Sequence, residues 1–477
     1  MERIYFDKQI FSHLFKGEKA EYKELLNFLI KNQERFLFCY SHAHLRDLKN
    51  DKTDIKYREL EFMETLVKDN YLSYHAIEKK TSCYLVRPLK AFKDIEEDDE
   101  TISFENLFDD FDLSSATDEQ RKQFGKAKDL FYNQKLDFEF SQIEDLPDDI
   151  SAPLKKVLPS EISSMTLMEW TEHFMGMISS MEEDKSIYKG LRNIVDKYIN
   201  NGRFSIEHDE IDFNDDLKNS VLQKSFIEYV NSNLNPKGDK EITDYDFHTN
   251  AYSTLDLLGI SKEPSKSVKF KNLMNDGYHS YYGGFCDYVV SDDRGFLKKT
   301  KVIYKLLNIN TKVMHIDDFI PFFSLLSKQT ETSPSAFFGL LLKDLKNGIV
   351  IGSKPSIRFN RYTTTIKPYH KYLGYFNLID SMQEDSQDYI YLYRKTKNYS
   401  YFNFFREYEG IINKAIRLFG IDFNNKLSFD WDTEIKEIKD GKWEGRFWDF
   451  GKLTVLIDIN AGTRDLGLLI TSKQNTE

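Results

Sequence analysis

The feature that most constrains the fold is a pair of short apolar runs, residues 3–7 and 36–40, with helical patterns between and after them. The second run, Phe-Leu-Phe-Cys-Tyr, is apolar at every position, which is typical of a strand covered on both faces. Helical patterns at 9–15 and 20–31 separate the two runs, and another at 42–49 follows Ser41, a residue suited to cap a helix. This order predicts an α/β fold with a parallel sheet and flanking helices.

The alternation stops near residue 90 and returns in three elements, a strand at 286–291, a helix at 296–307 and a strand at 312–316. We therefore expect one α/β domain split between residues 1–90 and 265–325. A long, mostly helical insertion at 91–264 interrupts it, with a methionine and aromatic stripe in 165–199 that is typical of a core.

Residues 326–477 are expected to form an α+β domain, because strand-like runs surround a helical pattern there. Basic and aromatic side chains are mixed along 354–406, among them Arg358, Arg361 and Lys395. Cations neutralise phosphates and exposed aromatic rings stack on unpaired bases, so this domain is a candidate recognition module for nucleic acid. An aromatic core with solvated lysines is the alternative.

The net charge of −12 does not exclude a nucleic-acid partner, because the acidity is local. Residues 94–149 carry a net charge of −14, and the other residues sum to +2. This acidic segment is either a solvated insertion or a cover that mimics phosphate over a cleft.

Three cysteines are too few and too scattered for a disulfide framework or a zinc cluster. The first residues carry charge where a signal peptide needs a long apolar stretch, and no window approaches the ~18 apolar residues of a membrane span. We therefore expect a cytoplasmic protein without a membrane partner.

Four carboxylates stand at or beside the ends of the expected elements, at Asp7, Asp47, Asp276 and Asp293. Two carboxylates about 4 Å apart repel by ~4 kcal/mol at an effective dielectric of 20, so a cluster of four needs a cation. Oxygen ligands alone favour Mg²⁺ or Mn²⁺. Such a cation activates water and stabilises charge on phosphate, which is the chemistry of a metal-dependent nuclease.

Each acid also has a structural alternative. Asp7 and Asp276 could cap helices, Asp47 could be a surface charge of its helix, and Asp293 could belong to a turn after a strand. His279 follows Asp276 by three residues on the same helix face, where it could touch phosphate, orient a ligand or simply pack.

In their order, these motifs resemble the PIN-like domain family of Mg²⁺- or Mn²⁺-dependent nucleases. The resemblance rests on a strand ending at Asp7, a strand and Ser41 followed by Asp47, and Asp276 followed by a strand with Ser291-x-Asp293. It covers about residues 1–90 and 265–320. The chain departs from the family in its long insertion and in having Asp47 where the family more often has Glu.

The resemblance implies an endonuclease that prefers RNA over DNA, with single-stranded DNA as a possible substrate, and a toxin or phage-defence role. Asp7, Asp276 and Asp293 would bind the metal, Asp47 would reach it through water, and Ser291 would hydrogen-bond a ligand carboxylate or the scissile phosphate. The alternative is a catalytically silent PIN-like scaffold that binds nucleic acid or a protein. The nuclease hypothesis requires Asp7 and Asp293 to lie within about 10 Å of one another.

Overall fold

The computed structural model describes residues 1–97, 117–133, 213–220, 222–259, 270–325, 333–355, 362–384, 387–460 and 465–472, with residue 135 and parts of 165–197. The contacts divide the chain into two compact units. One combines Met1–Phe92 with His279–Glu477, and the other is Lys93–Tyr278.

A six-stranded sheet forms the centre of the first unit, in the order β4-β3-β2-β1-β5-β6. Its strands are β1 (Glu2–Phe6), β2 (Phe36–Ser41), β3 (Asn70–His75), β4 (Lys80–Leu85), β5 (Tyr288–Ser291) and β6 (Lys312–His315). All neighbouring strands pair in parallel except β3 and β4, which form an antiparallel hairpin that the sequence did not predict. The expected mixed α/β fold with a parallel sheet is thus confirmed.

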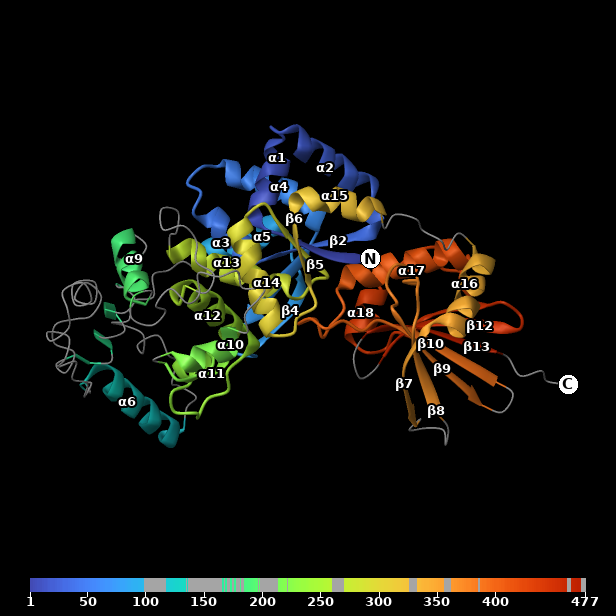
Figure 1. Cartoon of the computed structure of the whole chain (residues 1–477). Coiled ribbons are helices and arrows are strands. Elements are labelled where there is room, and N and C mark those ends of the chain that lie inside the picture. The colour runs from blue at the N-terminus through green and yellow to red at the C-terminus, as the bar shows by residue number, and fades with distance from the viewer. Residues whose placement is uncertain are drawn as a thin grey trace. The chain divides into compact units, whose positions relative to one another are not determined.

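Helices follow the strands of this sheet: α1 (Lys8–Lys16), α2 (Ala20–Lys31), α3 (His42–Lys49), α4 (Ile55–Val67), α5 (Pro88–Glu97), α14 (Arg294–Leu306) and α15 (Ile316–Leu325). Figure 1 shows α1, α2, α4 and α15 gathered on one side of the strands. The Ser41 hydroxyl accepts from the Ala43 N–H and caps α3, as the sequence predicts. Helix α13 (Phe270–Gly283) crosses the boundary between the two units.

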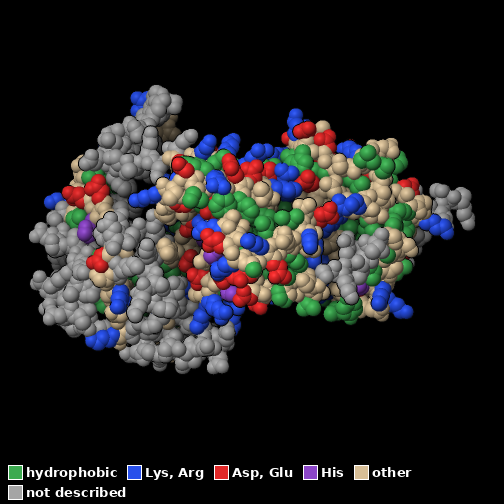
Figure 2. All heavy atoms as spheres, turned by 90° about the horizontal axis from the view of Figure 1, so that it is seen from above, with side chains coloured by type: hydrophobic (Ala, Val, Ile, Leu, Met, Phe, Trp, Pro, Cys, Tyr) green, Lys and Arg blue, Asp and Glu red, His purple; other side chains and the backbone are tan. Residues whose placement is uncertain are grey.

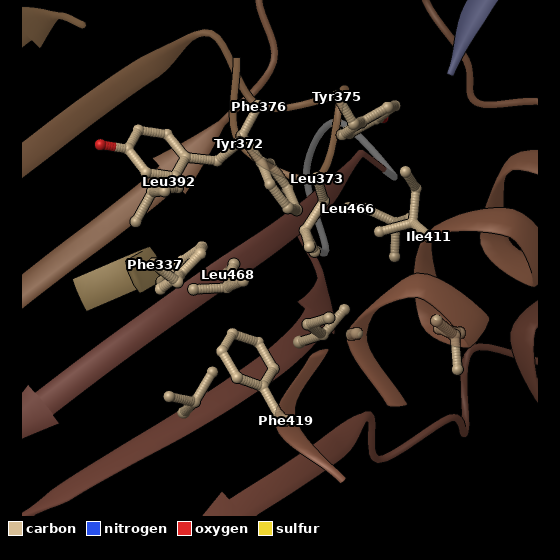
Figure 3. Packing of buried hydrophobic residues seen from close by; sticks show 14 of the residues in the cluster. Phe337, Tyr372, Leu373, Tyr375, Phe376, Leu392, Ile411, Phe419, Leu466 and Leu468 are labelled. Atoms are coloured by element: carbon tan, nitrogen blue, oxygen red, sulfur yellow. The ribbon is translucent and has the colours of Figure 1, made fainter. Parts of the chain in front are cut away.

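The C-terminal part of the same unit is a seven-stranded antiparallel sheet in the order β11-β12-β13-β10-β9-β8-β7. The strands are β7 (Ile349–Pro355), β8 (Tyr362–Lys367), β9 (Leu378–Glu384), β10 (Gln387–Tyr393), β11 (Arg446–Asp449), β12 (Leu453–Ile459) and β13 (Leu466–Ser472). Its helices are α16 (Pro334–Asn347), α17 (Phe405–Phe419) and α18 (Glu434–Lys439). Figure 3 shows Phe337, Phe419, Leu466 and Leu468 packed together between helices and sheet, and all four are buried.

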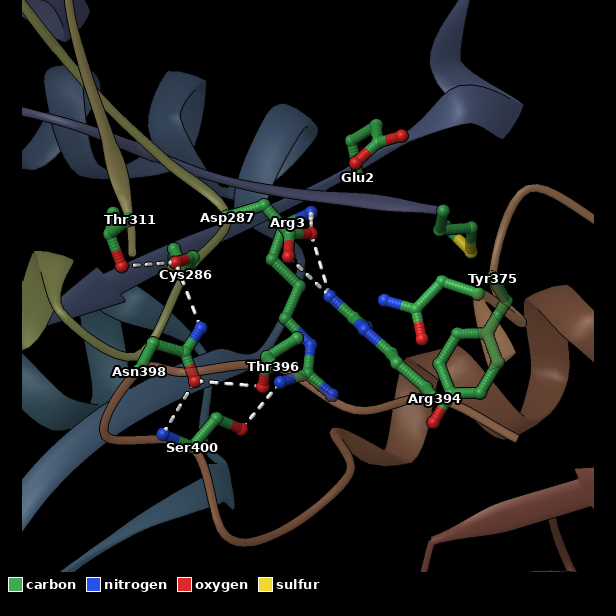
Figure 4. A network of polar contacts seen from close by, with 12 residues as sticks. Glu2, Arg3, Cys286, Asp287, Thr311, Tyr375, Arg394, Thr396, Asn398 and Ser400 are labelled. Atoms are coloured by element: carbon green, nitrogen blue, oxygen red, sulfur yellow. Dashed lines mark hydrogen bonds and ion pairs between the residues drawn. The ribbon is translucent and has the colours of Figure 1, made fainter. Parts of the chain in front are cut away.

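A buried ion network joins the two sheets of this unit, and Figure 4 shows the part of it around Arg3, Asp287 and Arg394. The Arg3 guanidinium, on β1, donates to both carboxylate oxygens of Glu407, on α17, at 2.7 and 2.6 Å. Arg394 donates to Glu407 at 2.8 Å and to both oxygens of Asp287 at 2.5 and 2.7 Å. These contacts tie residues 326–477 to the parallel sheet, and both parts belong to one compact unit.

The second unit is helical in the part that the structure describes, with α6 (Asp118–Tyr132), α9 (Lys185–Ile194), α10 (Phe213–Asp216), α11 (Phe226–Leu234) and α12 (Asp244–Leu257). The buried Asp256 accepts from the Tyr188 hydroxyl at 2.7 Å and pairs with Arg192 at 3.5 Å. Most of the acidic segment and much of the stripe at 165–199 lie outside the described residues. No described helix is both long and apolar enough to span a membrane.

Replacing Glu407 with Gln should destabilise the protein strongly, because two buried guanidinium groups lose their shared carboxylate. Breaking a buried ion pair costs about 3–5 kcal/mol. On the same helix, Arg417 pairs with Glu34 at 3.0 Å with both side chains more than half exposed, so Arg417→Ala should cost about 0–1 kcal/mol. Denaturant midpoints would measure both, and equal shifts for the two variants would contradict this assignment.

Candidate functional site

The strand order places a topological switch point between β1 and β5. From β1 the chain continues outward through β2 and β3, whereas β5 continues to β6 on the other side. In sheets of this kind, ligands bind in the crevice outside the carboxyl ends of the strands at the switch point. Asp7 directly follows β1, and Ser291 is the last residue of β5.

At this edge the Ser291 hydroxyl links the Asp7 carboxylate to the backbone of Asp293. Ser291 Oγ donates to Asp7 Oδ2 and accepts from the Asp293 backbone N–H at 2.9 Å. The contact between Ser291 and a carboxylate is therefore present, and the proximity that the nuclease hypothesis requires of Asp7 and Asp293 is met.

Both acids also cap helices, so the structural alternative for Asp7 describes one of its roles. Asp7 Oδ1 accepts from the Ile10 N–H at 3.1 Å at the start of α1. Asp293 Oδ1 accepts from the N–H groups of Gly295 and Phe296 at 2.7 and 3.0 Å at the start of α14. Two helix N-termini, which carry partial positive charge, thus lie beside the pair of carboxylates.

Burial makes Asp7 an unusual carboxylic acid. The side chain is nearly inaccessible, and this burial raises its pKa to about 6, with a smaller contribution in the same direction from Asp293. The hydrogen bonds from Ser291 and Ile10 act in the opposite direction. Asp293 is exposed. A cation at this edge would favour the ionised form of Asp7.

Asp47 is held by a histidine. His279, on α13, donates from Nε2 to Asp47 Oδ2 at 3.0 Å, and its Nδ1 lies 2.8 Å from the Tyr5 hydroxyl. His279 and Tyr5 are buried, whereas the Asp47 side chain is about one-third exposed. The sequence identified His279 as a candidate but missed Tyr5. The available signal was the strand period of two, which puts Tyr5 on the same face of β1 as Asp7.

Asp276 is not at the start of a helix, and this expectation was wrong. Helix α13 includes residues from Phe270 on, so Asp276 lies in its middle, one turn before His279. Its contacts assign it to the unit Lys93–Tyr278. The site described within the first unit therefore contains Asp7, Asp47 and Asp293.

The structure describes only one of the three residues proposed for substrate contact in the C-terminal part. Arg358 and Arg361 lie outside the described residues. Lys395 is exposed, and its backbone is tied to the Asn377 side chain at 2.9 Å. Arg394, next to Lys395 in the chain, and Tyr375 are buried, so neither side chain is exposed on the surface.

A cleft of about 580 Å³ opens beside Asp292, between α2, the turn after β5 and the start of α15. The Asp292 carboxylate accepts from the Tyr22 hydroxyl at 3.1 Å and lies 3.3 Å from His315 Nε2. Lys19 and the exposed Arg294 also line it. The sequence did not indicate Tyr22 or His315, because they come from elements that carry no recognisable motif.

The donor set fits a hard cation in kind. Asp7 and Asp293 offer carboxylate oxygens, and Mg²⁺ is usually held by one or two carboxylates together with waters and substrate phosphates. Among the residues that the structure describes, no three His, Cys, Asp or Glu side chains form a preassembled ion site. Comparisons with protein-family models, with curated proteins and with solved structures give no match.

The stability of the protein should depend on the protonation of Asp7. Because its folded pKa is raised to about 6, its stabilising contribution is present below about pH 4 and is lost as the pH rises through 6. Asp7→Asn keeps the helix cap and removes the charge. Between about pH 4.5 and 7.5 the variant should therefore gain roughly 2 kcal/mol relative to the parent protein.

Denaturant unfolding at several pH values would measure this difference, in the absence of divalent cations. Asp287→Asn is a matched control, because burial would raise the pKa of Asp287 but Arg394 holds it well below its ordinary value. Its difference from the parent protein should stay nearly flat over the same range. A flat difference for Asp7→Asn as well would show that Asp7 is not a strained carboxylate.

Proposed function

We propose that this protein is a divalent-cation-dependent endonuclease that cleaves phosphodiester bonds. The observation that supports the proposal is the meeting of Asp7 and Asp293 through the Ser291 hydroxyl at the switch point of a parallel sheet. The preference for RNA over DNA, and a role as a toxin or phage-defence effector, rest on the resemblance to PIN-like nucleases alone.

In this proposal, Asp7 and Asp293 would hold Mg²⁺ or Mn²⁺. The bound cation would supply a polarised phosphate and an activated water for in-line attack. Ser291 fixes the rotamer of Asp7 through its hydroxyl and the position of Asp293 through the backbone N–H. The N-termini of α1 and α14 add partial positive charge where the phosphate would lie.

Substrate binding would rely on local cations. On the face drawn in Figure 2, the described Lys and Arg side chains are interspersed with Asp and Glu side chains. Arg294 is exposed at the start of α14, next to Asp293, and Lys19 lines the same cleft. These two residues are candidates to contact the backbone of the nucleic acid on either side of the scissile bond.

The second candidate is a catalytically silent scaffold that binds nucleic acid or a partner protein. This candidate is favoured because each acid has a structural role that needs no cation. Asp7 and Asp293 cap helices, and Asp47 is hydrogen-bonded to His279. The absence of a preassembled ion site among the described residues points in the same direction.

Asp293→Asn separates the two candidates, because asparagine caps a helix as well as aspartate but carries no charge. With labelled single-stranded RNA and DNA, we expect cleavage by the parent protein in Mn²⁺, none in EDTA, and a loss of about 100-fold or more in the variant. Electrophoresis of the products would measure the rates.

Asp318→Asn, an exposed acid of α15, is the control that should cleave like the parent protein. Thermal unfolding should show both variants folded. Equal cleavage by Asp293→Asn, or no metal-dependent cleavage of either nucleic acid by the parent protein, would leave the scaffold as the better description.

A further inference from the structure

A chain of hydrogen bonds leads from the buried core to the carboxylate of Asp47. Its members, in order, are Ser41, Tyr5, His279 and Asp47, and the buried His44 flanks the inner end by accepting from the Ser41 N–H. All but Asp47 are buried. The chain connects helix α3, strands β1 and β2 and helix α13, so it crosses the carboxyl edge of the sheet on which Asp7 also stands.

Backbone groups at the inner end determine where the protons lie. The Ser41 N–H donates to His44 Nδ1 at 3.0 Å, so this nitrogen is an acceptor. His44 Nε2 lies 2.8 Å from the Phe6 carbonyl oxygen, which can only accept, so Nε2 carries the proton. Burial keeps His44 neutral by lowering its pKa well below the ordinary value. The histidine at this end therefore has a single possible tautomer.

The outer end is determined in the same way. A carboxylate only accepts, so His279 Nε2 donates to Asp47. With Nε2 as the donor, Nδ1 is the acceptor for the Tyr5 O–H at 2.8 Å. Tyr5 in turn accepts from Ser41 Oγ at 2.7 Å. Each donor in this chain, from the Ser41 hydroxyl through the Tyr5 hydroxyl to His279 Nε2, is therefore directed toward Asp47.

We propose that Tyr5 and His279 are positioning residues that aim the Asp47 carboxylate at the cation site. This inference rests on the function proposed above, and it assigns Asp47 as the acid that reaches the cation through water. Asp47 is only partly buried on a helix, and the hydrogen bond from His279 restricts the rotamers of its side chain. His279 is hydrogen-bonded to Tyr5, which precedes Asp7 by two residues at the end of β1, and this places the relay beside the pair of acids.

Partners of this kind have measurable effects in metal sites. Residues that orient a ligand through a hydrogen bond typically cost 10- to 100-fold in metal affinity or activity when they are removed. Tyr5→Phe removes one hydroxyl from a fully buried ring and leaves the packing in place. It should weaken Mn²⁺ binding about 10-fold, and Asp47→Asn should weaken it by as much or more.

The decisive measurement is a double-mutant cycle read by Mn²⁺ titration calorimetry. If Tyr5 acts through Asp47, adding Tyr5→Phe to Asp47→Asn should produce no further loss of affinity. His279→Gln should retain part of the affinity that His279→Leu loses, because the glutamine amide can still donate to Asp47. Tyr304→Phe is the matched control, since it removes another buried hydroxyl, which donates to Ser280 on α13 at 2.6 Å, and should leave the affinity unchanged.

The outcomes distinguish this inference from the function on which it rests. If the parent protein binds no Mn²⁺, or if Asp7→Asn and Asp293→Asn bind as it does, the cation site itself is wrong. If those variants lose Mn²⁺ but Tyr5→Phe binds like the parent protein, or adds its full effect to Asp47→Asn, the relay has no positioning role. Thermal unfolding of each variant would exclude loss of the fold as the cause.

Discussion

The buried ion network of Arg3, Asp287, Arg394 and Glu407 is the constraint on which the first unit depends. Burial opposes ionisation of both acids, yet the two guanidinium groups more than offset it and hold their pKa values below the ordinary range. Arg3 lies in β1 one residue before the pairing with β5 begins, and Asp287 directly precedes β5. The Arg3 N–H donates to Asp287 Oδ2 at 2.8 Å, and the Asp287 N–H donates to the Arg3 carbonyl at 2.9 Å. The network therefore aligns the two central strands at their amino ends.

The same alignment determines which residues lie side by side at the carboxyl ends of β1 and β5. β1 and β5 pair with Ile4 opposite Tyr288 and Phe6 opposite Val290, which brings Asp7 beside Ser291. A slip of one residue would turn every side chain of a strand to the other face of the sheet. The C-terminal part of the chain thus holds the register of β1 and β5. It supports the candidate site in this way, although none of the acids of that site comes from it.

The sequence predicted most elements of the parallel sheet because their signals are local. The apolar run of β2, the capping serine before α3 and the strand-helix-strand pattern of β5, α14 and β6 each depend on neighbouring residues. The β3–β4 hairpin was missed, since its short strands are rich in polar residues and the four residues between them contain no glycine, asparagine or proline to indicate a tight turn. The helix position of Asp276 was also wrong, because the residues before it give no distinct start signal.

The candidate site was predictable only in part. Asp7, Asp47, Asp293, Ser291 and His279 could be named, since polar residues at strand ends are visible in the chain. Their partners could not, because Tyr5 and Arg3 read as parts of a strand and His44 as a helix residue. Which of these side chains meet depends on the pairing of strands that are far apart in the sequence.

The sequence by itself determined the α/β alternation, the acids at the strand ends and the local caps that begin the helices, because each depends on residues within a few positions of one another. Only the tertiary structure decided that Ser291 joins Asp7 to Asp293 and that Tyr5 and His279 are hydrogen-bonded in a chain that ends at Asp47. It also decided that buried ion pairs link the C-terminal part to β1 and to Asp287. Most of these contacts join residues separated by more than 200 positions, so their geometry follows from how the elements pack and not from any pattern along the chain.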